Sequence, residues 1–297
     1  MSRRAIVTGA TGFVGSNLVR RLIEDGWQVS IITRDNSNFD KLDGLEGQIS
    51  AFTYDGAVER MLEIFSIVKP DIVFHTAALV LTDHQPDQID ALIRSNILFG
   101  THLLEAMDKN QVNKMINTGT SWQHFEDAEY DPVCLYAATK QAFEAILAYY
   151  SNVKGIKIIT LKLLDNYGAG DTRPKLLALL NKLRQSTNQT LGMTKGEQII
   201  NLVHIRDVIN AYLVSAERLL NNWVQEYESY SVSTEEMLSV KQLVELIEEI
   251  LELKLPIEWG ARPYREREVM IPWSSELKLP GWEPEISLRA GLQEYLS

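Results

Sequence analysis

The chain has 297 residues, with 29 Lys and Arg against 40 Asp and Glu, so its formal net charge is −11. Its composition, 45% hydrophobic and 23% charged, is that of a globular protein and excludes a disordered chain, because enough apolar surface exists to offset the entropy of ordering. The acidic balance argues against a nucleic-acid partner, which would need a basic surface.

The start of the chain and its cysteine content bear on the cellular compartment. No apolar run approaches the roughly 18 residues that a membrane span needs. The first residues lead from Arg3 and Arg4 into a short strand and a glycine loop, without the apolar stretch of a signal peptide. The one cysteine, Cys134, has no second cysteine with which to form a disulfide. We therefore expect a cytoplasmic protein of enzyme size, with no membrane partner and no metal site.

The first half of the chain alternates β-rich runs with helical patterns. Strands are predicted at 4–8, 28–33, 49–54, 71–75, 114–117 and 156–163, and helices at 15–25, 58–68, 89–108 and 136–150. This alternation predicts an α/β fold of the Rossmann type, with a doubly wound parallel sheet whose ligands bind at the carboxyl ends of the strands. We assign residues 1–165 to this dinucleotide-binding domain.

The pattern loosens in the second half of the chain. Helices are predicted at 175–184 and 241–253, and turn-rich stretches lie between strands too short to assign. We interpret residues 166–297 as a smaller substrate-binding lobe that covers the ligand edge of the sheet. Within it, residues 201–220 show a strand-then-helix pattern that predicts a return to the large domain.

A glycine loop follows the first predicted strand and opens the first helix. Its glycines have the spacing G-x-x-G-x-x-G, a variant of the dinucleotide-binding fingerprint. Missing Cβ atoms allow a tight turn and a close approach of backbone to pyrophosphate, and the helix N-terminus supplies amide N–H groups. The alternative is a glycine-rich turn without a ligand, which the position between strand and helix disfavours. The expected cofactor contacts are Gly9, Thr11, Gly12, Phe13, Val14 and Gly15.

The end of the second strand bears on the identity of the cofactor. NAD sites often place an Asp or Glu there for the ribose 2′-hydroxyl, whereas an Arg suits the 2′-phosphate of NADP. This strand ends in Thr33, and Arg34 follows, which favours NADP(H) over the alternative NAD. The competing interpretation is that Arg34 is only a solvated loop arginine. The neighbouring carboxylate of Asp35 also weakens the case for a phosphate contact. Asp55, after the third strand, could bind the adenine amino group or simply start a turn.

A Tyr-x-x-x-Lys pattern begins the predicted helix at 136–150. The separation of four residues puts Tyr136 and Lys140 on one face of that helix. A nearby ammonium lowers the pKa of a phenol, and such a tyrosine can exchange a proton with a hydroxyl or carbonyl during hydride transfer. The pattern is weak alone, but the upstream glycine loop and the strand that ends in Thr120 strengthen it.

Together these motifs resemble those of the extended short-chain dehydrogenases/reductases, of the nucleotide-sugar epimerase/dehydratase/reductase kind. The resemblance covers nearly the whole chain. The matching positions are 9–15, 75–78, 95–101, Tyr136 with Lys140, 165–168, 203–208, Arg262 with Pro263, and 281–284. Eight motifs in the family's order are hard to obtain by chance.

The resemblance implies roles for the residues around the reaction site. Tyr136 would be the proton donor or acceptor, and Lys140 its tuning partner and a ligand of the nicotinamide ribose. Thr120 falls at the family's Ser/Thr position, which hydrogen-bonds the reacting oxygen, with Ser121 as a second hydroxyl beside the substrate. Ala77 lies where the family's backbone passes the cofactor.

The resemblance also implies a site for the diphosphate of the substrate. Asp165 falls where the family usually has an Asn that contacts the sugar diphosphate, and the acid puts that contact in doubt. Arg262 matches the family's diphosphate-binding arginine. A second family arginine is replaced by Ile200, so binding would rest on Arg262, with Arg173 or Arg265 as further candidates.

Departures from the family pattern narrow the expected reaction. The family's 4,6-dehydratases carry Asp-Glu after the Ser/Thr position, and Ser121-Trp122 stand there in this chain, which disfavours dehydration. His124 replaces part of a further family motif, and it is a substrate contact, a second acid or only a polar rim residue.

The runs 119–124, 135–144 and 263–266 look most similar to the CDP-abequose and CDP-paratose synthase branch, whose members reduce the 4-keto group of a CDP-linked 3,6-dideoxyhexose with NADPH. The resemblance therefore implies a 4-ketoreductase of deoxysugar biosynthesis that acts on a nucleotide-linked sugar, and a homodimer, which is usual in the family. The nearest alternative is an NAD-dependent nucleotide-sugar 4-epimerase. A non-catalytic NADP-sensing protein is a remote alternative, because such relatives typically lose the Tyr/Lys pair.

Overall fold

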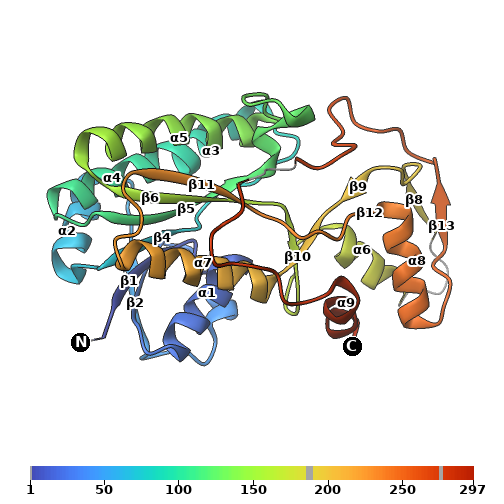
Figure 1. The fold of residues 1–297 in the computed structure, drawn as a ribbon, viewed down its shortest axis with the longest axis horizontal. Coiled ribbons are helices and arrows are strands. Elements are labelled where there is room, and N and C mark those ends of the chain that lie inside the picture. Colours follow the sequence, from blue (N-terminus) through green and yellow to red (C-terminus); the bar gives the residue numbers. More distant parts are fainter. Residues whose placement is uncertain (1, 185–189, 274–276) are drawn as a thin grey trace.

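A computed structural model describes residues 2–184, 190–273 and 277–297 and contains a central sheet of seven parallel strands (Figure 1). The strand order is β11-β6-β5-β4-β1-β2-β3, so the order reverses between β1 and β4. The strands are β1 (Arg4–Thr8), β2 (Gln28–Thr33), β3 (Ile49–Thr53), β4 (Ile72–His75), β5 (Lys114–Thr120), β6 (Lys157–Leu163) and β11 (Tyr227–Val232). The predicted Rossmann-type fold class is confirmed, and such a reversal is where doubly wound sheets bind ligands.

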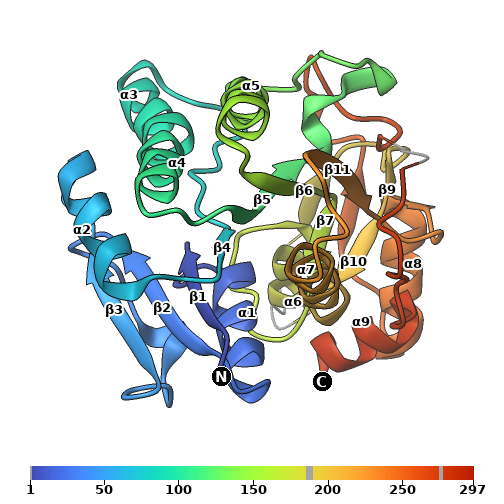
Figure 2. The ribbon, with the colours of Figure 1, turned by 60° about the vertical axis from the view of Figure 1, so that its left-hand side comes forward.

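Helices cover both faces of this sheet (Figures 1 and 2). One face carries α1 (Phe13–Glu24) and α7 (Ile205–Leu220), and the other carries α2 (Val58–Val68), α3 (Ile89–Ile93), α4 (Phe99–Lys109) and α5 (Leu135–Lys154). Along β1, Ala5 and Val7 pack into the core beneath α1 and α7, whereas Ile6 packs into the core beneath α2, α4 and α5. Burial on both faces explains why β1 and β4 lack polar alternation.

A π-helical turn, Arg94–Leu98, joins α3 to α4, so the helix predicted at 89–108 is continuous but locally widened. Asn96 in this turn is buried, and its side chain bonds both backbone polar groups of Leu79 and the hydroxyl of Thr139 on α5. Asn96 therefore fixes the loop after β4 to the helix that carries Tyr136.

The smaller lobe has its own apolar core, formed chiefly by three helices and short strand pairs. Its helices are α6 (Leu176–Leu183), α8 (Val240–Leu251) and α9 (Leu288–Leu296). Its strand pairs are β7 (Asp165–Tyr167) with β10 (Leu202–His204), β9 (Ile199–Ile200) with β12 (Leu238–Ser239), and β8 (Leu191–Met193) with β13 (Ile257–Trp259). The lobe lies beyond the carboxyl ends of the central strands, at the right of Figure 1.

The chain passes between the two layers more than once. Helix α7 packs on the central sheet, as the pattern of 201–220 indicates, although β10 pairs with β7. β11, which the sequence pattern did not predict, adds a seventh strand beside β6. Farther on, the Trp282 indole donates to the Asp207 carbonyl and packs in the core beneath α1 and α7. The lobe is therefore not a simple continuation of the chain after residue 165.

Within the described parts of the chain, no helix is both long and apolar enough to cross a bilayer. Over the same residues, no three His, Cys, Asp or Glu side chains lie together in a way that could hold a metal ion.

Candidate functional site

A cleft of about 570 Å³ opens between the carboxyl ends of the central strands and the smaller lobe. The loops after β1, β4, β5 and β6 all reach it, because parallel strands end at one edge of the sheet. The predicted residues that line it are Gly9, Gly12, Phe13, Val14, Gly15, Thr120, Ser121, Tyr136, Asp165, Arg173 and Arg265.

The glycine loop needs its missing side chains. Gly9 has φ +69°, and a Cβ on it would lie 2.6 Å from the backbone nitrogen of Ala77, so the loops after β1 and β4 touch there. A Cβ on Gly15 would overlap the carbonyl oxygen of Gly9, which shows how closely α1 packs on β1. Gly12 is the N-cap of α1, and no side chain caps the first turn. The free amide N–H groups at such a terminus suit a phosphate.

The remaining residues predicted to bind the cofactor lie outside the cleft lining. Ala77 contacts Gly9 as described, and Thr11 lies in the glycine loop itself. Thr33 is buried at the end of β2, and Arg34 beside it is exposed. Asp55 accepts a hydrogen bond from the backbone N–H of Ala57, which is the turn-starting role that the sequence also allowed.

Thr120 and Tyr136 meet at the reaction site. Thr120 is the last residue of β5, Tyr136 lies in the first turn of α5, and both line the cleft. The predicted lowering of the Tyr136 pKa is wrong, because burial raises that pKa and outweighs the opposite effect of the Thr120 hydroxyl. Tyr136 therefore holds its proton at neutral pH.

Lys140 is buried one turn along α5, with only 1% of its surface exposed. Its Nζ has no hydrogen-bond partner among the described residues. Burial lowers the pKa of Lys140 to about 8, and the carboxylate of Glu144 opposes that shift. A buried ammonium without a hydrogen-bond partner is costly. The unpaired Nζ of Lys140 is therefore suited to a bound ligand that supplies hydrogen-bond acceptors.

Basic side chains surround Asp165, the first residue of β7. Lys175 Nζ lies 2.9 Å from Asp165 Oδ1, and the charges of Lys175, Arg173 and Arg265 all lower the pKa of Asp165. All four residues line the cleft. Lys175 was not among the predicted site residues, although it stands at the start of a predicted helix, two residues after Arg173.

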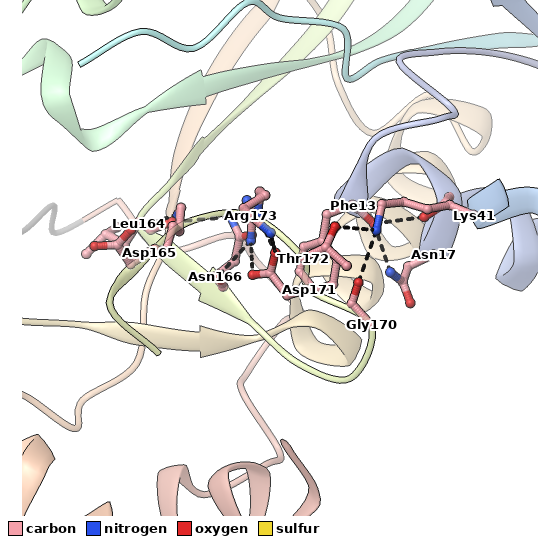
Figure 3. Close-up of polar contacts among 12 residues, drawn as sticks. Phe13, Asn17, Lys41, Leu164, Asp165, Asn166, Gly170, Asp171, Thr172 and Arg173 are labelled. Carbon is pink, nitrogen blue, oxygen red and sulfur yellow. Dashed lines mark hydrogen bonds and ion pairs between the residues drawn. The ribbon is translucent and has the colours of Figure 1, made fainter. Parts of the chain in front are cut away.

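Arg173 also ties the lobe to the glycine loop. Its guanidinium donates to the carboxylate of Asp171 and to both oxygens of Asn166, and it stacks 4.5 Å from the ring centre of Phe13 (Figure 3). Lys41 Nζ donates to the Gly170 carbonyl and to the Thr172 hydroxyl. The loop after β7 is thus held against the start of α1.

The arginine expected to bind the diphosphate does not line the cleft. Arg262 is exposed, and its backbone N–H donates to the Met193 carbonyl beside β8. Arg265 lies three residues later and reaches the cleft, with its guanidinium near the Trp122 ring and paired to Glu268. The turn around residue 262 therefore decides which of the two arginines reaches the cleft, and residue spacing alone does not reveal it.

His124 forms part of the wall of a second, smaller cavity of about 170 Å³ that shares Ser121 with the main cleft. Its ring stacks on Trp273, with 4.3 Å between ring centres. Nδ1 lies 3.1 Å from the Ala128 carbonyl, and Nε2 lies 2.7 Å from Lys162 Nζ. Burial and Lys162 lower the His124 pKa, so the ring is neutral, and both of its nitrogens have protein partners. This arrangement disfavours the second-acid interpretation of His124.

Comparisons with known proteins agree with this geometry. Residues 5–231 match the NAD dependent epimerase/dehydratase family. The chain is 28% identical over 301 residues to the CDP-abequose synthase of Salmonella typhimurium, covering 98% of this chain and 96% of that protein. It is 30% identical over 272 residues to that of Yersinia pseudotuberculosis, covering 91% of each. Among solved structures, the UDP-glucose 4-epimerase of Thermotoga maritima with UDP-glucose superposes with a TM-score of 0.83 at 25% identity, covering 99% of this chain and 97% of that one.

Proposed function

The chain belongs to the NAD-dependent epimerase/dehydratase family, and we propose that it reduces the 4-keto group of a nucleotide-linked deoxyhexose with NADPH. The substrate that we favour is a CDP-4-keto-3,6-dideoxyhexose, because CDP-abequose synthases are similar to the chain over nearly its full length. The observation that carries the proposal is that Thr120 and Tyr136 line the same cleft as the glycine loop. Ser121 and Trp122 follow Thr120, so no acid–base pair for water elimination stands there.

The glycine loop and Lys140 fit a dinucleotide. The uncapped start of α1 would hold the pyrophosphate, and the unpaired Nζ of Lys140 would bind a ribose hydroxyl. When bound, the nicotinamide supplies hydride chemistry.

Tyr136 would donate its proton to the carbonyl oxygen of the sugar. Its raised pKa keeps the phenol protonated, as an acid in a reduction must be. Thr120 would hydrogen-bond the same oxygen as negative charge develops on it, and the Lys140 ammonium would stabilise the phenolate that remains.

The basic cluster around Asp165 supports a diphosphate-linked substrate. Lys175, Arg173 and Arg265 bring three positive charges to the cleft against the Asp165 carboxylate. Lys175 also neutralises the acid that stands where the family usually has an amide. We propose that these three side chains, with Arg265 in the place we expected for Arg262, bind the diphosphate.

Replacement of Lys175 by Met should raise KM for the nucleotide sugar about 10- to 100-fold, because a charge-assisted hydrogen bond to phosphate is lost. The diphosphate lies away from the reacting carbon, so kcat should change little. Steady-state kinetics measure both constants. Lys195→Met, an exposed lysine that does not line the cleft, is the control. A fall in kcat with unchanged KM would contradict the assignment.

Replacement of Arg34 by Ala should lower kcat/KM for NADPH about 10- to 100-fold and leave that for NADH nearly unchanged, because only NADPH carries the 2′-phosphate. The two cofactors are compared by their absorbance decay with one sugar. Arg21→Ala removes an exposed arginine that pairs with Asp25 on α1 and serves as the control. Equal losses with both cofactors would mean that Arg34 does not recognise the phosphate.

The competing function is a nucleotide-sugar 4-epimerase, which the similarity to the Thermotoga maritima enzyme supports. The decisive assay follows NADPH and NADH absorbance with CDP-, dTDP-, GDP- and UDP-linked 4-keto-deoxysugars. Consumption of NADPH matched by one reduced sugar supports the reductase. Tightly held NAD in the purified protein and inversion of a sugar, without net consumption of cofactor, would support the epimerase.

We also propose a homodimer that forms through the outer faces of α3 and α5. Ile89 and Ile93 on α3 and Tyr149 and Val153 on α5 are apolar and exposed. Both helices lie on the same side of the sheet (Figure 1). We expect light scattering to give twice the chain mass of 33.7 kDa, and Val153→Glu to lower it to the mass of one chain.

A further inference from the structure

A buried polar cluster lies behind Thr120 and has no role in the function proposed so far. Its members are Gln123, His124, Glu144 and Lys162. Gln123 is fully buried, and at most 10% of the Glu144 and Lys162 side chains is exposed. Charged groups are rarely buried to this extent without a structural or functional reason.

Gln123 links the end of β5 to α5. Its Oε1 accepts a hydrogen bond of 3.0 Å from the backbone N–H of Thr120. Its Nε2 donates to Glu144 Oε1 at 2.9 Å and to Gln141 Oε1 at 2.8 Å. The amide is therefore fixed in one orientation, and Glu144 is connected to the backbone of Thr120 through a single side chain.

Lys162 supplies the positive charge in this cluster. Its Nζ lies 3.4 Å from Glu144 Oε2 and donates to Nε2 of the neutral His124. Space for the cluster is provided by Gly119, because a Cβ there would lie 2.9 Å from Lys162 Cγ and 3.2 Å from Gln123 Oε1. The strand before Thr120 is thus shaped around these two side chains.

Glu144 also acts on the catalytic face of α5. Tyr136, Lys140 and Glu144 are each four residues apart, so they share one face of the helix. The Glu144 carboxylate favours the charged form of Lys140 against the effect of burial. His75, which faces Lys140 from β4, is neutral, since burial and Lys140 lower its pKa to about 3. Glu144 itself faces Lys162 on β6, Tyr227 on β11, and, at longer range, His124 and Tyr130.

We propose that Glu144 is a positioning residue for the reduction: through Gln123 it holds Thr120 against Tyr136, and it supplies the counter-charge one turn from Lys140. The proposal rests on the proposed function, because that function makes Thr120, Tyr136 and Lys140 the working groups. Glu144 is buried and does not line the cleft, so it would act through Gln123 and through its charge.

The test removes the charge of Glu144 without leaving Lys162 unpaired. Glu144→Gln alone would bury an uncompensated ammonium, whereas Glu144→Gln with Lys162→Met removes both charges and should retain the wild-type melting temperature within a few degrees. In the double variant Lys140 no longer has the charge of Glu144 nearby, so its pKa should fall. We therefore expect kcat to fall about 10-fold at pH 7 and the alkaline limb of its pH profile, which reports loss of the Lys140 proton, to move about one unit lower, with KM nearly unchanged. A stably folded double variant with wild-type kcat and pH profile would overturn the proposal.

Two further variants separate the two effects of Glu144. Gln123→Met breaks the link to Thr120 but keeps the charges, so kcat should fall about 10-fold with the alkaline limb unmoved. Glu105→Gln is the control, because it removes a carboxylate charge on α4 that accepts a hydrogen bond from Tyr150 and does not line the cleft. It should leave kcat and the pH profile unchanged, and an equal shift in this variant would count against a specific effect of Glu144.

A substrate-free measurement distinguishes failure of this inference from failure of the proposed function. The dissociation constant of NADPH, followed by protein fluorescence between pH 6 and pH 10, reports the Lys140 ammonium through its ribose contact. If the wild type reduces no sugar, the reductase assignment fails, but a shift of this binding curve to lower pH in the double variant still supports Glu144, because the Lys140 pKa falls when the Glu144 charge is lost. An unshifted binding curve in that folded variant overturns the positioning role.

Discussion

Replacement of Tyr136 by Phe should lower kcat about 10²- to 10⁴-fold, the range expected when a general acid is removed. The Tyr136 phenol lies beside Thr120 in the cleft lining, and burial raises its pKa and keeps it protonated. Phe retains the ring and its packing, so the NADPH dissociation constant and the melting temperature should change little. The loss should fall on kcat, because the proton is needed only as the carbonyl oxygen gains charge. Stopped-flow decay of NADPH absorbance measures the chemical step directly.

Tyr150→Phe is the matched control for this prediction. Tyr150 lies on the same helix, is also largely buried, and donates its hydroxyl to Glu105. It does not line the cleft, so its removal should leave kcat within about two-fold of the wild type. Turnover retained in Tyr136→Phe would show that another group or water donates the proton.

The parts of the fold that could be predicted are those with local patterns. β1, β2 and α2 begin and end at the residues that the periodicity predicts. A parallel strand buried on both faces is a short apolar run, and a helix that ends before Pro is marked by that residue, so both can be recognised locally. β11 was missed because Tyr227–Val232 alternates polar residues and lies at the edge of the sheet, where half of its surface needs no apolar side chain. Its pairing with β6 is a long-range contact that no local pattern encodes.

The candidate site divides in the same way. The glycine loop and the Tyr136/Lys140 pair could be predicted because the chemistry depends on spacing along one turn or one helix face. The pKa of Tyr136 could not, since its direction depends on how deeply the tertiary structure buries the phenol. The choice between Arg262 and Arg265, and the pairing of Lys175 with Asp165, depend on turns in the lobe whose geometry the sequence does not reveal.

Gly15→Ala should displace α1 from β1 and abolish tight cofactor binding. The new Cβ would overlap the Gly9 carbonyl oxygen and lie 2.7 Å from the Gly9 carbonyl carbon and 2.9 Å from Ala10 Cα. All of these are backbone atoms, so relief requires movement of the helix start rather than rotation of a side chain. We expect unfolding to be easier by about 3 kcal/mol and the NADPH dissociation constant to rise about 10²-fold, because the uncapped N-terminus of α1 no longer faces the pyrophosphate correctly.

Gly26→Ala separates these two effects. Gly26 follows the other end of α1 with φ +78° and has no atom within 4 Å of a new Cβ, so Ala there costs only the left-handed backbone strain of about 1–2 kcal/mol. We expect a lower melting temperature with unchanged NADPH binding. Calorimetric melting and fluorescence titration of both variants check the pair of predictions. If Gly26→Ala weakened NADPH binding as much as Gly15→Ala, general destabilisation would explain the loss, and close packing at the glycine loop would not be what positions the cofactor.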